Sequence, residues 1–414
     1  MDASSAGHNR IVPVLSLLHR HVWQRLPQRP RRTVLLHGAA LAAPRPSPDA
    51  DPALPLIVVG NFGSASGLGE SARLCYDALT AAGLPVFGID LTSVLMQPKD
   101  LRFECLDGRG IIGRGTLILH VNAPLVPLAM LGIGRRGLIG KHVVGYWSWE
   151  LPRIPADWRH GIAFVHEVWV PSTFTAAAVK PLLAGCPVHV VPHPVALRAP
   201  RRPPRTLPAK RCFTVLSIFN MASSFARKNP LAAIRAFRQA FGNDPECRLI
   251  LKCVNGYSFR RGLELIRHEA AGASNIIFLD EPMSGCELAQ LYEQADVLLS
   301  LHRSEGFGFT IAEAMMHGLP AVCTNWSGNI DFLTPEIGLP ITCGLVPAHD
   351  PQGTYEHPDM SWAEPDIVEA AAALKLLRAD PQRRKRLGKR ASAAVHDRFS
   401  AASYVGAARN ILGL

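Results

Sequence analysis

Short apolar runs alternate with segments of helical pattern over residues 213–342, and this alternation constrains the fold more than any other feature of the chain. A strand, a helix and a further strand form a crossover unit, which places successive strands parallel in one sheet. A capping-box pattern at Ser284 and Glu287 opens one of these helices. The second half of the chain is therefore predicted to be a doubly wound α/β domain, with these strands: 213–219, 248–254, 275–279, 297–301, 321–324 and 339–342.

Length and composition predict a second domain of the same kind. A chain of 414 residues is longer than one ordinary core accommodates. Apolar residues make up 48% and charged residues 19%, as expected for a core-forming protein. The predicted parts are a flexible basic extension, an N-terminal Rossmann-like domain, a proline-rich basic linker, a C-terminal Rossmann-like domain and C-terminal helices: 1–55, 56–197, 198–210, 211–385 and 386–414.

A glycine-rich turn follows the fourth predicted strand of the second half. Gly306 and Gly308 permit a tight reversal, so the amides that open the next helix stay free for an anion such as a diphosphate. Thr310 is predicted to cap that helix, which places Glu313 in its first turn, beside the positive end of the dipole. Glu305 faces the same cleft from the strand side and can bind sugar hydroxyls. The alternative for both glutamates is a solvated surface acid.

Basic residues precede this turn in the same half. Arg227 and Lys228 stand at a helix entrance, where a guanidinium fork and an ammonium suit phosphate oxygens. Lys252 lies near the end of a strand, and open α/β sheets bind ligands at the carboxyl ends of their strands. Asn220, just after the first strand of this half, is assigned to the same site. Ordinary solvated charge is the alternative for the Arg-Lys pair.

The segment 281–331 resembles the donor-binding segment of retaining GT-B glycosyltransferases, glycosyltransferase family four, also called group 1. The likeness rests on the runs 300–308, 313–315 and 320–329. Members of that family have two doubly wound domains that face a central cleft. The resemblance therefore implies a GT-B α/β architecture, with the last helix packing on the first domain.

The resemblance also implies roles for single residues. The paired glutamates of the family bind the donor sugar and the nucleotide ribose, which are the roles implied for Glu305 and Glu313. The common family form has an arginine five residues before the lysine, whereas this chain has Ser223 there, so the division between Arg227 and Lys228 stays open. Residues and resemblance together assign two sets. The catalytic set is Glu305, Lys228, Arg227 and His120. The donor-binding set is Glu313, Gly306, Phe307, Gly308, Phe309, Thr310, Lys252, Gly67, Gly69 and Asn220.

The N-terminal domain opens with a strand at 56–60 and a glycine-rich loop that resembles the first loop of the family's acceptor domain. This loop, with Gly67 and Gly69, can lie against the donor phosphates before a helix that begins near residue 71. The pattern Gly67-x-Gly69-x-x-Ala72, followed by Asp90, also satisfies the relaxed dinucleotide fingerprint. An NAD(P)-dependent oxidoreductase is therefore the alternative function. A strand ending at residue 60 leaves a loop too long for the tight turn of that fingerprint.

Three further positions of this domain are candidates. His120 follows a buried strand, and family members often place a histidine near the donor sugar; a buried structural histidine is the alternative. Trp147, Trp149 and Glu150 can form a sugar-stacking and hydroxyl-binding wall for the acceptor, or the tryptophans can belong to the core. The uncharged window 116–134 is predicted not to span a membrane, because prolines interrupt it.

Charge and cysteine content indicate the partners and the compartment. A net charge of +11 predicts an anionic partner, for which a membrane surface or lipid-phosphate acceptor is favoured over nucleic acid. Nine cysteines without metal or disulfide spacing fit the cytoplasm, with peripheral binding to the inner face of the plasma membrane left open.

The predicted function is retaining transfer of a mannose-like or glucose-like hexose from a nucleoside-diphosphate sugar to a glycan or lipid-linked glycan. The expected process is bacterial surface polysaccharide synthesis, without a metal or other cofactor. A catalytically silent nucleotide-sugar-binding protein of the same fold is a second alternative.

Overall fold

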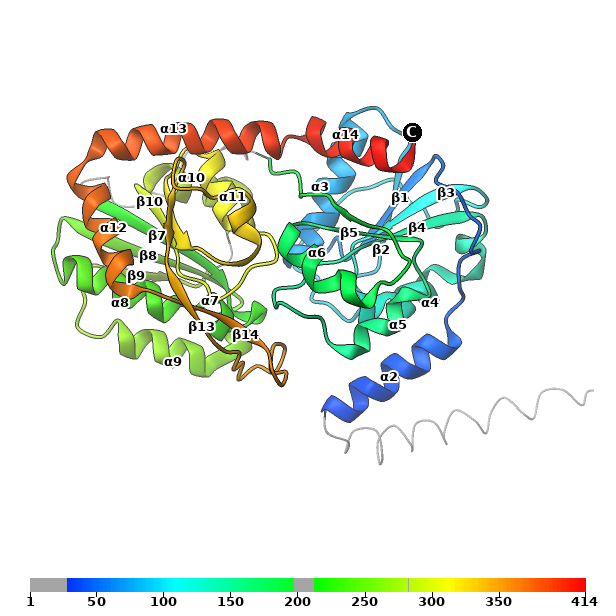
Figure 1. Ribbon diagram of the computed structural model, residues 1–414, viewed down its shortest axis with the longest axis horizontal. Helices are drawn as coiled ribbons and strands as arrows, with labels where there is room; N and C mark the ends of the chain where they lie inside the picture. The colour runs from blue at the N-terminus through cyan, green and yellow to red at the C-terminus, as the bar shows by residue number, and fades with distance from the viewer. Residues whose placement is uncertain (1–27, 197–211, 282) are drawn as a thin grey trace, which may run out of the picture.

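The computed structural model describes residues 28–196, 212–281 and 283–414. Two α/β domains lie side by side, and each is built on a six-stranded parallel sheet with helices on both faces (Figure 1). This confirms the predicted GT-B class of architecture. The predicted linker 198–210 and the first half of the predicted extension lie outside the described residues.

The N-terminal sheet has the order β2-β1-β3-β4-β5-β6. Every residue of β1 and β3 is buried, because helices cover both faces of a parallel sheet and favour continuous apolar runs. The strand order reverses between β1 and β3, and such a switch point opens a crevice at the carboxyl ends of the strands. The strands are β1 Leu56–Gly60, β2 Val86–Asp90, β3 Gly115–Leu119, β4 Lys141–Tyr146, β5 Glu167–Val170 and β6 Val188–Val190.

The C-terminal sheet has the order β12-β11-β10-β7-β8-β9 and its own switch point between β7 and β10. An antiparallel hairpin, β13 Cys343–Pro347 and β14 Ser361–Pro365, stands outside the sheet. All six predicted strands of this half are present, with ends that differ by one residue at most: β7 Phe213–Asn220, β8 Cys247–Val254, β9 Ile276–Leu279, β10 Val297–Ser300, β11 Ala321–Thr324 and β12 Leu339–Ile341.

The helices cross over between the strands, and the predicted capping box at Ser284 is formed at the start of α10. The bounds of the helices are α2 Gln28–Ala42, α3 Gly67–Ala81, α4 Val126–Leu138, α5 Arg159–Ile162, α6 Thr173–Val179, α7 Phe225–Lys228, α8 Pro230–Phe241, α9 Arg260–Glu269, α10 Gly285–Gln294, α11 Phe309–Met316, α12 Ile367–Ala379, α13 Pro381–Arg398 and α14 Ala401–Leu412. Among the described residues, no helix is long and apolar enough to cross a bilayer.

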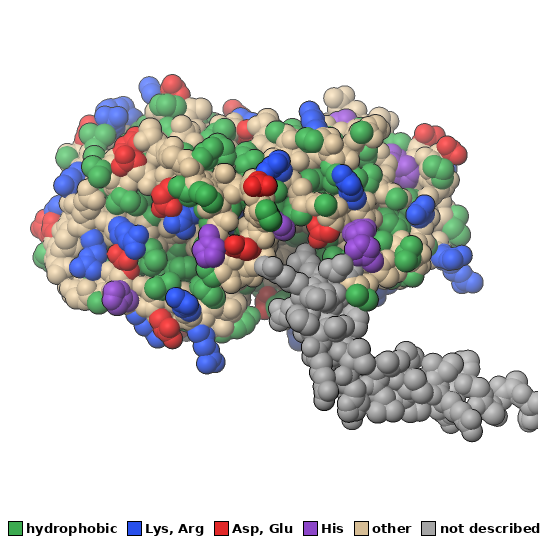
Figure 2. Space-filling model, turned by 60° about the horizontal axis from the view of Figure 1, so that its bottom comes forward, with side chains coloured by type: hydrophobic (Ala, Val, Ile, Leu, Met, Phe, Trp, Pro, Cys, Tyr) green, Lys and Arg blue, Asp and Glu red, His purple; other side chains and the backbone are tan. Residues whose placement is uncertain are grey.

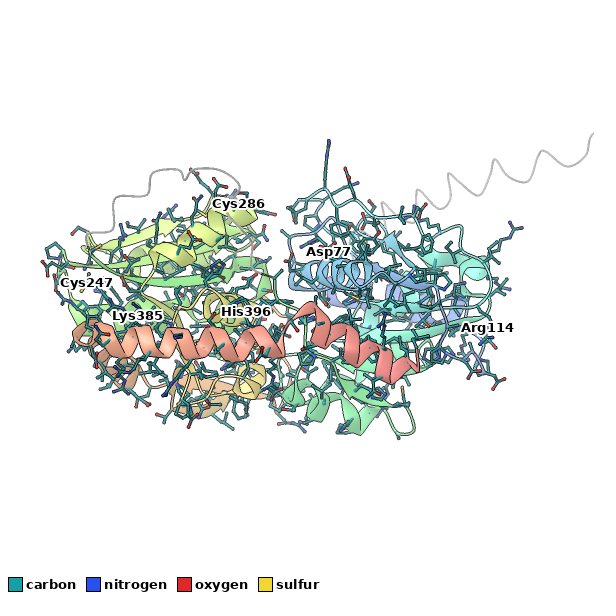
Figure 3. All side chains as sticks on the ribbon, turned by 90° about the horizontal axis from the view of Figure 1, so that it is seen from above. Asp77, Arg114, Cys247, Cys286, Lys385 and His396 are labelled. Carbon is teal, nitrogen blue, oxygen red and sulfur yellow. The ribbon has the colours of Figure 1, made fainter. Side chains whose placement is uncertain are left out.

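The last two helices tie the domains together. Figure 3 shows α13 running along the C-terminal domain, from Lys385 to His396, and α14 continuing over the N-terminal domain. Tyr404 of α14 is buried in the N-terminal core and its hydroxyl contacts the Cys75 sulfur of α3 at 3.1 Å. The boundary expected at 385/386 falls inside α13, because this one helix runs without interruption through residue 398.

The part of the predicted flexible extension that the structure describes is ordered. Helix α2 packs against α4 and α5, with Leu36 and Ala39 buried and the rings of His37 and His160 4.3 Å apart. The sequence did not predict this packed helix within the extension 1–55. Arginine and proline are frequent in this segment, which made its apolar residues easy to overlook in the sequence.

Candidate functional site

The candidate site lies where the carboxyl ends of the two sheets meet. On the C-terminal side, β7 ends at Asn220 and β10 at Ser300, so the switch point between them lies next to the turn that contains Glu305. On the N-terminal side, β1 leads into the glycine-rich loop and β3 into His120. The sequence-predicted residues therefore come from both switch points.

The turn is formed as predicted, but its helix begins earlier. Gly308 is the N-cap of α11, with φ of 102°, a conformation that favours glycine. Thr310 is therefore inside the helix and does not cap it. Glu313 is the fifth residue of α11, beyond the first turn, so the predicted dipole stabilisation is wrong. Because glycine has no side chain, it cannot cap the first amides, which remain the natural place for an anion.

Arg227, Lys228 and Glu305 come together in one buried charge cluster. Arg227 Nη1 donates to Glu305 Oε2 at 3.2 Å and to the Ser304 carbonyl at 2.7 Å. Lys228 Nζ donates to the other oxygen of Glu305. Arg227 is only 2% exposed and also faces Glu150, with 3.9 Å between Nη2 and Oε1. The cations thus already have carboxylate partners, which a ligand phosphate would have to displace.

The opposite charges of this cluster stabilise one another's charged forms. Burial alone would raise the pKa of Glu305, but Lys228 and Arg227 outweigh it and lower the pKa to about 2. Burial lowers the pKa of Lys228, and Glu305 opposes that shift. Glu305 is consequently a carboxylate at neutral pH, acting only as a hydrogen-bond acceptor.

The other predicted donor-binding side chains have partners inside the C-terminal domain. Glu313 accepts a 2.9 Å hydrogen bond from the Tyr292 hydroxyl. Lys252 is buried and donates to the carbonyls of Cys253 and Glu281, both at 2.6 Å. Asn220 caps the short turn that follows β7, accepting from the Ala222 amide at 2.9 Å.

A buried polar network under the turn was missed by sequence reasoning. His302 Nε2 lies 3.0 Å from Asn329 Oδ1, and the Asn329 amide donates to the Thr324 carbonyl at 2.9 Å. Ser327 accepts from the Glu305 amide at 2.7 Å, and burial lowers the pKa of His302. These residues lie in the segment that resembles the family, so the sequence pointed to the region. No sequence pattern, however, indicates which of them hydrogen-bond to one another. This network fixes the backbone that carries Glu305.

The glycine-rich loop of the N-terminal domain is formed, but helix α3 starts at Gly67 rather than near residue 71. Ser66 caps it by accepting from the Gly69 amide. Six residues, 61–66, therefore separate β1 from α3, which is too long for the tight turn of a dinucleotide fingerprint. Asp90 instead accepts from the amide and hydroxyl of Thr92. The geometry does not favour the oxidoreductase alternative.

His120 is fully buried at the end of β3, and burial lowers its pKa to about 3. Its Nδ1 lies 2.6 Å from the Ser71 hydroxyl, which also lies 3.0 Å from Nδ1 of His193. The His193 ring stacks on Phe309, the first residue of α11, with centroids 4.5 Å apart. Sequence reasoning missed Ser71 and His193, because the fold brings them from α3 and the segment after β6.

The predicted acceptor wall is closed in this arrangement. Trp147 is fully buried and Trp149 is 6% exposed, packed against Tyr355 of the opposite domain. Glu150 accepts from the Tyr355 hydroxyl at 2.8 Å. Acceptor binding by Trp147, Trp149 and Glu150 therefore stays a prediction that requires the domains to separate. A surface pocket of about 990 Å³, partly lined by Arg114, lies away from this site at the outer end of the N-terminal domain (Figure 3).

Comparisons with solved structures agree with the fold. Sucrose-phosphate synthase from Thermosynechococcus elongatus superposes with a TM-score of 0.62 at 16% identity, covering 87% of this chain and 100% of its own. HepE from Anabaena, solved with UDP and glucose, gives 0.59 at 14% identity, covering 86% of this chain and 99% of that one. A TarM variant from S. aureus, solved with UDP, gives 0.53 at 12% identity, with 72% of this chain covered but only 55% of TarM.

The two doubly wound domains with a site at their facing edges define the GT-B fold. Residues 214–357 match the family described as "Glycosyl transferases group 1", and this matched segment contains the charge cluster and the turn. No curated protein sequence matches the chain significantly.

Proposed function

We propose that the protein is a retaining glycosyltransferase of family four that moves a mannose-like or glucose-like hexose from a nucleoside-diphosphate sugar. One observation carries the proposal. The cations Arg227 and Lys228 converge on Glu305 directly before the start of α11, within the group 1 domain. Neighbours of the same fold, including HepE solved with UDP and glucose, support the type of donor.

The proposed chemistry needs positive potential at the departing phosphate. Cleavage of the bond between the anomeric carbon and the phosphate oxygen leaves positive character on the sugar and negative charge on the diphosphate. Arg227, Lys228 and the first amides of α11 supply preorganised positive charge there, while Glu305 orients the sugar hydroxyls. Retention implies attack from the face of the leaving group, with the departing phosphate taking the acceptor proton. We assign no covalent nucleophile and propose that no metal or other cofactor is needed.

The acceptor is proposed to be a glycan or lipid-linked glycan of a bacterial surface polysaccharide, used at the inner face of the plasma membrane. The net charge of +11 supports an anionic partner. On the face shown in Figure 2, however, basic side chains are spread among acidic ones rather than gathered in one patch. Membrane contact is therefore proposed as weak and dependent on the acceptor lipid.

A ligand screen tests the proposal. UDP-sugars, GDP-sugars and nicotinamide dinucleotides are compared for thermal stabilisation, in EDTA so that a metal requirement shows itself. A donor at 100 times its Kd stabilises the folded state by about 2.7 kcal/mol. We expect one nucleotide-sugar to stabilise the wild type, Lys228→Ala to lose the effect, and the exposed control Lys375→Ala to keep it.

The outcomes of this screen separate the alternatives. Stabilisation by a nicotinamide dinucleotide alone would support the oxidoreductase. Binding of a nucleotide-sugar without hydrolysis or transfer over a long incubation would support the alternative of a catalytically silent binding protein.

A further inference from the structure

Four aromatic rings stack across the boundary between the domains. His120, Tyr146 and His193 belong to the N-terminal domain, with successive ring centroids 4.7 Å and 4.9 Å apart. His193 then stacks on Phe309 of the C-terminal domain at 4.5 Å. The column therefore ends on the residue that opens α11, beside the turn that carries Glu305.

Ser71 joins the two histidines of this column. The serine is 1% exposed, and its hydroxyl oxygen lies 2.6 Å from His120 Nδ1 and 3.0 Å from His193 Nδ1. Among the described residues, no other acceptor is within hydrogen-bond reach of this hydroxyl. A serine has one proton to donate, so it cannot donate to both imidazoles. Donating to one ring and accepting from the other is the arrangement that satisfies the hydroxyl and both Nδ1 atoms.

Because both rings are neutral, the shared contact with Ser71 couples the tautomer of His120 to that of His193. Burial lowers the pKa of His120 to about 3, and burial followed by the neighbouring His120 lowers the pKa of His193 well below its usual range. Both imidazoles are therefore neutral at pH 7, and each has one N–H. The arrangement that satisfies every group of the contact has the proton on Nδ1 of one ring and on Nε2 of the other, so we expect opposite tautomers.

One nitrogen of this system lacks a partner. His120 Nε2 is buried, and among the described residues nothing hydrogen-bonds to it. A buried nitrogen without a partner is unfavourable, and a ligand hydroxyl can relieve this. Because His120 is fully buried in this closed arrangement, the ligand reaches it only after the domains separate. A sugar hydroxyl can both donate and accept, so it suits either tautomer.

We propose that Ser71 and His193 are positioning residues that fix the tautomer of His120, whose Nε2 binds a hydroxyl of the donor sugar. Because His193 stacks on Phe309, the tautomer of His120 becomes sensitive to the position of the turn that carries Glu305. The identity of the ligand, a donor sugar, rests on the proposed function. The coupling between the two histidines does not, because it exists in the protein without ligand.

Nitrogen-15 spectra of histidine-labelled protein test the coupling at pH 7. The two rings are assigned with His120→Gln and His193→Gln, and their nitrogen shifts and couplings report the tautomers. We expect one ring protonated on Nδ1 and the other on Nε2, and Ser71→Ala to abolish this pairing. Two identical tautomers, or a charged imidazolium at pH 7, would overturn the inference whether or not the protein transfers sugar.

Kinetics test the positioning role. Ser71→Ala should raise KM for the nucleotide-sugar about tenfold, the loss of one hydrogen bond, while the Kd for the nucleoside diphosphate alone stays unchanged. His193→Phe keeps the stack and should behave like Ser71→Ala, and Ser71→Thr should retain most activity. The control is Ser392→Ala, which removes a 3.2 Å hydrogen bond to the Met316 carbonyl within the C-terminal domain. An equal loss of diphosphate affinity in Ser71→Ala would show a merely structural role and overturn the proposal.

Discussion

Ser172 of the N-terminal domain donates a 2.6 Å hydrogen bond to the carbonyl of Gly306 in the turn of the C-terminal domain. This contact joins the start of α6 directly to the proposed donor site. Gly306 also lies against the backbone of Trp149, where an added Cβ would be 3.2 Å from the carbonyl oxygen. The first domain therefore shapes the site of the second, and the described arrangement is a closed one.

Asp331 caps a helix of the opposite domain. Its carboxylate accepts from the Thr173 amide at 2.7 Å and from the Thr173 hydroxyl at 2.5 Å, at the start of α6. Asp331→Ala should weaken closure by about 1 kcal/mol, the value of one cap. We expect a larger radius of gyration in X-ray scattering and slower transfer, with unchanged diphosphate affinity. Asp366→Ala, which removes a cap inside one domain, is the control.

Replacement of Glu305 should affect both activity and stability. Glu305→Ala should abolish transfer, and it should also destabilise the fold by about 3 kcal/mol because buried Arg227 loses its closest carboxylate. Glu305→Gln keeps the shape and should be less destabilising. Transfer assays and urea unfolding measure the two effects. Near-normal transfer by either variant would contradict the assigned role.

Glu305 should make stability depend on pH in the acid range. Its pKa falls from 4.5 to about 2 on folding, so the stabilisation is complete above 4.5 and is lost as the pH falls through 2. The wild type should therefore lose stability between these values faster than Glu305→Gln. Urea unfolding at several pH values checks this. Parallel curves for the two proteins would contradict the shift.

Glu313→Gln should weaken nucleotide binding more than folding. The Tyr292 hydroxyl can still donate to the amide oxygen, so the internal contact survives while the charge for a ribose diol is lost. Calorimetry with the nucleoside diphosphate should show about tenfold weaker binding at nearly unchanged melting temperature. Equal affinities would place the ribose elsewhere.

Gly328→Ala should destabilise the turn. An added Cβ would lie 2.3 Å from the Gly306 carbonyl oxygen and 2.9 Å from the Glu305 carbonyl oxygen, and both are backbone atoms. We expect a loss of about 1–3 kcal/mol, typical of overpacking, together with weaker donor binding. The control is Gly344→Ala in the hairpin, where no atom lies within 4 Å of the added Cβ. Equal stability of the two variants would contradict the crowding.

Local pattern was sufficient for the regular elements and for the centre of the site. The strand at 321–324 was predicted with its observed ends. It is a short apolar run between a Gly-Leu-Pro turn at 318–320 and a polar loop, and such a run has few alternatives. Glu305 was found because the resemblance covers its segment, and Arg227 and Lys228 because they form a basic pair at a predicted helix entrance. Helix starts were less accurate: α3 and α11 both begin at or after a glycine, which the sequence presented as loop.

The sequence by itself determined two doubly wound domains and the paired acids and bases of the second, because these follow from periodicity and from residues close together in the chain. Only the tertiary structure decided which side chains meet across the domains: Ser172 with Gly306, Thr173 with Asp331, and His193 with Phe309. It also decided that Trp147 is fully buried in this arrangement and that α2 packs against α4 and α5. Contacts between residues more than a hundred positions apart depend on how two sheets face each other, and no local pattern encodes that orientation.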